Sequence, residues 1–110
     1  MTTFPFEERD WKYLQSIHDE LLHELCSNIN QQLVSLASSE EGTPHSRYLK
    51  TYEYIHEADK VVADCFNSWR RSNLGIIFLF LRKEKLLSDA QVKKLSAEAQ
   101  EWLRQLEASR

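Results

Sequence analysis

Apolar side chains recur every three or four residues along most of this chain, which is the spacing that places them on one face of a helix. The pattern predicts four helices, over about residues 6–37, 44–71, 74–85 and 89–108. The predicted apolar face of the first helix contains Trp11, Leu14, Ile17, Leu21, Leu22, Leu25, Ile29, Leu33 and Leu36. The predicted apolar face of the second contains Tyr48, Tyr52, Ile55, Val62, Phe66 and Trp69.

Residues that end and start helices separate these segments. A polar stretch over 38–42 ends the first helix, and Thr43 followed by Pro44 suits the start of the second. Ser88 with Gln91 three residues later is typical of a capping box. A short loop between two long helices predicts an antiparallel hairpin. We therefore expect one all-α domain over residues 1–110, either a four-helix bundle or a three-helix core with one short extra helix.

The third segment is apolar on every side over residues 74–81. Its period alone would also fit a buried strand, but its neighbours are helical and no second strand is predicted to pair with it. In a small monomer a short helix rarely buries its whole circumference. Either the other helices enclose it, or one side contacts another chain. We expect an interface there, with Ile77, Phe78 and Phe80 as its central residues.

Composition narrows the possible partners. Fourteen Lys and Arg stand against 17 Asp and Glu, a net charge of −3, so the chain lacks the basic surplus of nucleic-acid binding proteins. A basic strip lies at the predicted helix ends and contains Arg70, Arg71, Arg82, Lys83 and Lys85. It could meet an acidic partner or RNA, but no exposed aromatic residues are interleaved with it, and cations are common at helix ends because they favour the helix dipole. With only two glycines, no glycine-rich phosphate loop is possible.

Location is predicted from the same features. The apolar run over 74–81 has eight residues, whereas a membrane span needs about 20. The first ten residues include acidic side chains where a signal peptide would have an apolar core. Two cysteines are too few for a disulfide framework, so we interpret both as reduced thiols. We expect a cytoplasmic chain that contacts neither membrane nor nucleic acid.

Two polar residues fall at the centres of predicted apolar faces. His18 lies at the centre of the first helix's face and Asp59 at the centre of the second's. Burying an unpaired carboxylate is costly, so Asp59 needs a partner or an opening. In an ideal hairpin the two residues are offset by about 7 Å along the axis. They could form a structural polar network, line a pocket with Tyr52 and His56, or face an oligomer interface.

Metal and thiol chemistry have weaker support. Glu20 with His23, and Glu53 with His56, have the Glu-x-x-His spacing of di-iron bundles. However, the helical period turns Glu20, His23 and Glu53 away from the predicted core. We therefore predict no metal site and no cofactor.

Cys26 and Cys65 would lie opposite His56 and His18 in the predicted hairpin. Such pairs can activate a thiol, but no nucleophile turn or oxyanion loop accompanies them, and a buried cysteine usually acts as a small apolar residue. A disulfide between the two would require an axial slip of about 13 Å and is not expected.

These observations favour a non-enzymatic helical protein that acts by protein–protein contact, most simply as a homodimer formed through its apolar third helix. The alternative is a small-ligand, metal or catalytic pocket in the bundle around His18, Tyr52, His56 and Asp59.

Overall fold

The computed structural model describes residues 6–109, and within this range the chain forms helices and loops without a strand. The all-α prediction is therefore confirmed, and the ambiguous third segment is a helix. The α-helices are α1 (Glu8–Ser38), α2 (Pro44–Val62), α3 (Leu74–Lys83), α4 (Asp89–Val92) and α5 (Ala97–Ala108). A π-helical segment (Ala63–Asn67) and a 3-10 turn (Arg71–Asn73) connect α2 to α3.

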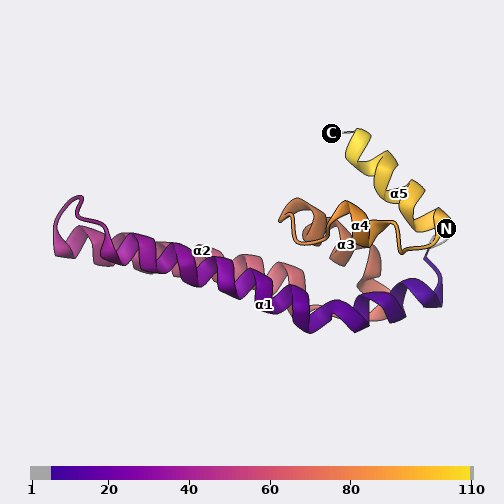
Figure 1. Ribbon diagram of the computed structural model, residues 1–110, viewed down its shortest axis with the longest axis horizontal. Coiled ribbons are helices and arrows are strands. Elements are labelled where there is room, and N and C mark those ends of the chain that lie inside the picture. Colours follow the sequence, from indigo (N-terminus) through magenta and orange to yellow (C-terminus); the bar gives the residue numbers. More distant parts are fainter. Residues whose placement is uncertain (1–5, 110) are drawn as a thin grey trace.

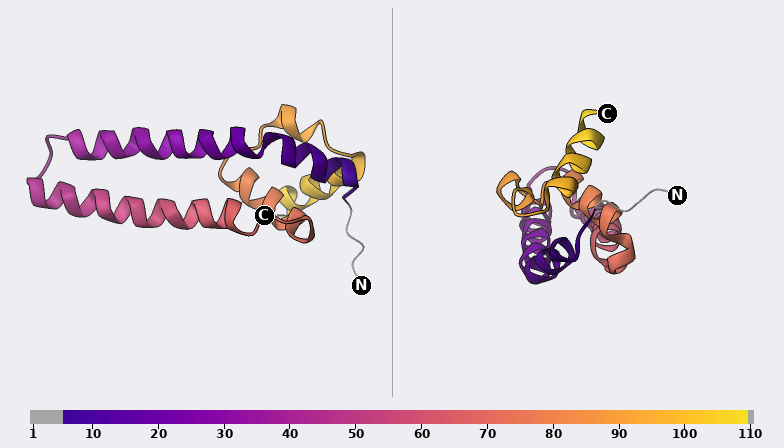
Figure 2. Two further views of the ribbon diagram at one scale, coloured as in Figure 1. Left: turned by 90° about the horizontal axis from the view of Figure 1, so that it is seen from below. Right: turned by 90° about the vertical axis from the view of Figure 1, so that its right-hand side faces the viewer.

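α1 and α2 form an antiparallel hairpin that projects far beyond the other helices (Figure 1). The views in Figure 2 show that no other helix accompanies its outer half. We call residues 26–57 the arm and the remaining described residues the head. All the buried side chains belong to the head, whereas residues 26–57 are partly or fully exposed. Along the arm the chain is thus a two-helix pair, and the four-helix bundle expected from the sequence is not seen within one chain.

The turn at the tip of the arm follows local chemistry. Gly42 adopts a φ of 73°, which favours glycine. The Thr43 hydroxyl then accepts a hydrogen bond from the Ser46 N–H at 3.1 Å, and Pro44 occupies the first turn of α2. The Arg47 guanidinium donates to the carbonyl oxygens of Glu41 and Gly42. The predicted ends of both long helices at this turn are confirmed.

The orientation of α2 differs from the prediction. Its less exposed side carries Arg47, Thr51, Tyr54, Ala58 and Val61. The predicted apolar face is wrong in its outer half, since Tyr48, Tyr52 and Ile55 are 64%, 62% and 49% exposed. The periodicity identified a continuous face of large residues, but α2 turns a face with several smaller side chains toward α1 instead.

α2 also ends earlier than expected. The α-helix stops at Val62, and the π-helical segment brings Cys65 and Phe66 into the head, where they are 1% and 9% exposed. The Asn73 amide nitrogen donates to the carbonyl oxygen of Ser68 and closes the turn before α3.

α3 forms the centre of the head. Leu74, Ile77, Phe78 and Leu81 are each at most 1% exposed. The ring of Phe78 lies 5.1 Å from that of Phe6. The other elements of the head therefore enclose most of α3.

The predicted fourth helix is split into two. The capping box is confirmed, because the Ser88 hydroxyl accepts from the Gln91 N–H at 3.1 Å. The first piece, α4, nevertheless ends at Val92. Ser96 then starts α5 as its N-cap, with its hydroxyl accepting from the Ala99 N–H at 3.2 Å. Ser96 is held there by a contact with the first turn of α1, which is described below.

Candidate interaction surface

An exposed face of α2 gathers large apolar and aromatic side chains. Its members are His45, Tyr48, Leu49, Tyr52, Ile55, His56 and Asp59, all of them exposed. At 3.6 residues per turn, they lie within about 60° of a line through Tyr52. We call these seven residues the α2 strip. Tyr48, Leu49, Tyr52 and Ile55 are 44–64% exposed, whereas large apolar side chains on a monomer are ordinarily buried in greater part.

Two pairs of stacked aromatic rings lie along the α2 strip. The rings of His45 and Tyr48 are 6.3 Å apart and 18° from parallel. Those of Tyr52 and His56 are 6.4 Å apart and 6° from parallel. Each stack joins residues one helical turn apart, which are neighbours on a helix surface. Side chains that already contact one another have less rotamer freedom to lose when a partner binds.

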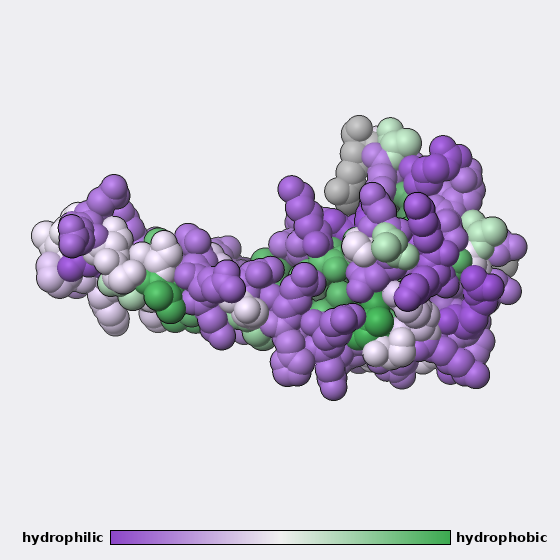
Figure 3. All heavy atoms as spheres, viewed as in Figure 1, coloured by the Kyte–Doolittle hydropathy of each residue, from purple (hydrophilic) through white to green (hydrophobic). Residues whose placement is uncertain are grey.

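The outer half of α1 also has a composition that is typical of an interface. No Asp, Glu, Lys, Arg or His occurs between residues 25 and 39. Val34, in this segment, is 67% exposed. Hydrophobic residues reach the surface along the arm as well as over the head (Figure 3). Depletion of charge together with exposed aromatic residues is typical of interface cores. This charge-free stretch is the sequence signal that could have directed attention to the arm.

The interface residues predicted on α3 lie elsewhere than expected. Ile77 and Phe78 are 1% and 0% exposed and belong to the core of the head. Phe80 is partly buried against that core. The exposed apolar residue of α3 is its neighbour Ile76, at 52%. The head buries these side chains within one chain, which leaves Ile77 and Phe78 no surface to offer a second.

The four residues predicted to line a pocket lie in different environments. His18 packs edge-on against Trp69, with ring centres 4.4 Å apart, and its Nδ1 lies 2.8 Å from Oδ1 of Asp19. Tyr52 and His56 stack on the outer face of α2. Asp59 is exposed, so its predicted position at the centre of a buried face is wrong. The cause is again the rotation of α2, which turns this face to solvent.

Among residues 6–109, the buried carboxylate is that of Asp10. It is 0% exposed and lies between the starts of α1 and α5. Its Oδ1 accepts from the Ser96 N–H at 2.7 Å, and its Oδ2 accepts from the Ser96 hydroxyl at 2.7 Å and the Glu7 N–H at 2.8 Å. The place of Asp10 in the first turn of α1 predicts only a favourable interaction with the helix dipole, because its partner Ser96 is 86 residues away in the sequence. Its hydrogen bonds are structural and leave no open site.

Metal and thiol chemistry gain no support from the geometry. Glu20, His23 and Glu53 are exposed, and among residues 6–109 no three His, Cys, Asp or Glu side chains are grouped to hold a metal ion. Cys26 and Cys65 are both free. Burial, reinforced by the nearby Glu84 and Asp64 carboxylates, raises the pKa of the Cys65 thiol to about 11. Cys65 is therefore protonated and a poor nucleophile near neutral pH.

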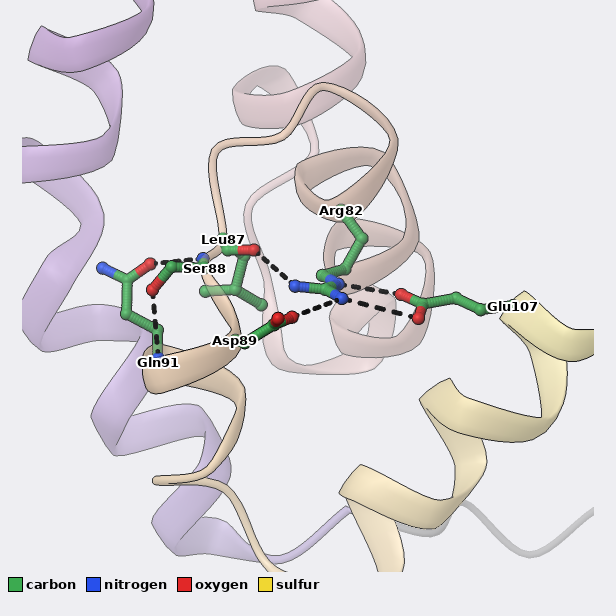
Figure 4. Close-up of polar contacts among 6 residues, drawn as sticks. All are labelled: Arg82, Leu87, Ser88, Asp89, Gln91 and Glu107. Carbon is green, nitrogen blue, oxygen red and sulfur yellow. Dashed lines mark hydrogen bonds and ion pairs between the residues drawn. The ribbon is translucent and has the colours of Figure 1, made fainter.

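A hollow of about 520 Å³ opens between α3, α4 and α5, but most of the charged side chains that line it are paired with one another. The Arg82 guanidinium donates to Glu107 at 2.8 Å, Asp89 at 3.0 Å and the carbonyl oxygen of Leu87 at 2.8 Å (Figure 4). The hydrogen bond that Arg82 donates to Glu107 is the main cause that raises the pKa of Arg82. Arg71, from the same predicted basic strip, pairs with Glu8 at 2.7 Å. These cations thus tie helices together.

Comparison with protein families, with curated proteins and with solved structures gives no match for this chain. Within residues 6–109, no helix combines the length and the apolar character needed to cross a membrane. A cytoplasmic location stays a prediction from the sequence. The function is therefore inferred from the surface of the molecule itself.

Proposed function

We propose that this chain is a non-enzymatic interaction protein whose arm binds another protein through the α2 strip. The observation that carries the proposal is the exposure of Tyr48, Leu49, Tyr52 and Ile55 on one face of a projecting helix. Removing apolar surface from water is favourable by about 25 cal/mol per Å². A partner that covers this face would gain that free energy, and the arm holds it clear of the head.

The proposal moves the expected interface from α3 to α2. It keeps the predicted mode of action, protein–protein contact, but replaces Ile77 and Phe78 by residues that a partner can reach. It is further supported by the charge-free segment 25–39 on the neighbouring helix. A polar pocket around His18 and Asp59 has no such support, because Asp59 is exposed while His18 packs into an aromatic stack.

Site-specific photo-crosslinking in the native cell tests this proposal. A photoreactive phenylalanine analogue replaces Tyr52 in one version of the chain and Lys12, an exposed residue of the head, in the control. We expect protein adducts from position 52, none from position 12, and loss of the adducts when Tyr48→Glu is added. Equal adducts from both positions, or none from position 52, would contradict an interaction through the strip.

A further inference from the structure

We propose that the partner of the α2 strip is a second copy of this chain, packed antiparallel so that Tyr52 of each copy meets Tyr52 of the other. This inference rests on the proposed function of the arm and names its partner. The two arms would then pack through their α2 helices, with each α1 on the outer side of its own α2.

The positions of the strip are symmetric about Tyr52. Three residues precede it at distances of three, four and seven positions, and three follow it at the same distances. A twofold axis through Tyr52 therefore maps the strip onto itself. Such an interface is isologous, which is the commonest form of oligomer contact. No neighbouring helix of the same chain covers this face, so a second copy can approach it (Figure 2).

The symmetric register also places complementary side chains of the two copies opposite one another. It places Leu49 of one copy opposite Ile55 of the other, and Tyr48 opposite His56. At the two ends His45 faces Asp59, which is the one acidic residue of the strip. Apolar side chains thus meet in the middle and polar ones at the rim, as in ordinary protein interfaces. An imidazole opposite a carboxylate is a complementary pair that favours this register over a parallel one.

The area of the α2 strip sets the affinity that we expect for the dimer. The strip extends over about 21 Å of helix. A single helix pair of this length falls short of the roughly 800 Å² per partner of a standard interface. We therefore expect a reversible dimer with a dissociation constant on the order of micromolar.

Sedimentation velocity of the purified full-length chain, from micromolar to near-millimolar concentration, tests the dimer. We expect the wild type to dimerise with increasing concentration and Tyr52→Glu to stay monomeric, because two carboxylates would meet at the twofold axis. Ile76→Glu is the matched control, since Ile76 is an apolar residue of α3 that is 52% exposed, against 62% for Tyr52. It should dimerise like the wild type, and circular dichroism should show that both variants fold.

A monomeric wild type at every concentration would overturn the second copy as partner. So would a dimer that survives Tyr52→Glu but is lost in Ile76→Glu. If the purified chain is monomeric while position 52 still captures a different protein in the cell, the proposed function stands and this inference fails. If position 52 captures nothing, both fail.

Cross-linking tests the register. With Cys26→Ser and Cys65→Ala as background, Tyr52→Cys should link two chains through a short bismaleimide, because its two copies are adjacent. Lys50→Cys, about 160° away around the same helix, should link far fewer chains. Efficient linking of Lys50→Cys without linking of Tyr52→Cys would overturn the antiparallel arrangement.

Discussion

Asp10 shows how a charged side chain is accommodated in the core of a small protein. The cost of removing a carboxylate from water is offset by its three hydrogen bonds, two from Ser96 and one from Glu7. Two of the three donors are backbone N–H groups at helix starts, where a negative charge is favourable. One side chain thereby caps two helices.

Removal of this carboxylate should destabilise the whole head. Asp10→Ala leaves the two buried donors of Ser96 and the partly buried Glu7 N–H without an acceptor, and we expect the free energy of unfolding to fall by about 2–4 kcal/mol. Urea denaturation followed by circular dichroism measures the change. Glu24→Ala, at an exposed position of the same helix, should change stability by less than about 0.5 kcal/mol. Equal effects of the two substitutions would show that the hydrogen bonds of Asp10 do not stabilise the head.

The Cys65 thiol predicts a pH dependence of stability at the alkaline end. Its pKa is raised from an ordinary value near 9 to about 11 in the folded chain. Between these values the unfolded chain releases the thiol proton while the folded chain keeps it, so unfolding is increasingly favoured as the pH rises. We expect the free energy of unfolding to decrease from about pH 9 to pH 11, and less so in Cys65→Ala. Parallel slopes for both proteins would contradict the assignment.

At the scale of single elements, α3 holds the head together. Phe78 is fully buried, and Phe78→Ala should cost about 3–5 kcal/mol of unfolding free energy. Ile76→Ala, two positions away but 52% exposed, should cost much less. Urea denaturation of the two variants shows whether α3 acts as a core helix or as an interface helix. A mild effect of Phe78→Ala accompanied by loss of a dimer would instead restore the interface predicted on α3.

Helix starts and ends were predictable where the determining chemistry is local. The ends of α1 and α2 at the tip, and the start of α4 at Ser88, depend on capping residues within four positions of each other. The break between α4 and α5 was not predicted: Ser96 caps α5 locally, but the contact that holds Ser96 in place comes from the distant Asp10. An apolar pattern that continues through residues 92–106 carries no trace of that contact.

The candidate surface was predictable only in part. The period correctly grouped Tyr48, Tyr52, Ile55 and Asp59 on one face of a helix. It could not reveal which face of α2 meets α1, because large apolar residues serve equally as core and as interface. Ile77 and Phe78 were assigned to an interface for the same reason. Periodicity measures amphipathicity, whereas burial depends on tertiary packing.

At the scale of the whole molecule, the arm dominates the shape. The chain measures 53 × 29 × 24 Å, with a radius of gyration of 17.0 Å. A compact chain of this length would have a radius of about 13 Å. The difference reflects an arm that is supported by two helices alone.

The proposed dimer has a distinctive outline. Antiparallel arms that cross at Tyr52 place the two heads at opposite ends, with a maximum dimension of about 80 Å. Small-angle X-ray scattering at high concentration should give this length and a pair-distance distribution with a second maximum from the separated heads. Heads side by side, with a maximum dimension close to that of one chain, would contradict the arrangement.

The bond between Asp10 and Ser96 also orders events during synthesis. Asp10 leaves the ribosome early, whereas the serine that satisfies it follows 86 residues later. The hairpin contains only contacts within the first 62 residues and can form while translation continues. At the base of the hairpin, however, the Asp10 carboxylate has the Glu7 N–H but not the two Ser96 donors until the start of α5 emerges. Closure of the head is therefore a late step, and a nascent chain halted before residue 96 would carry a finished arm on an open base.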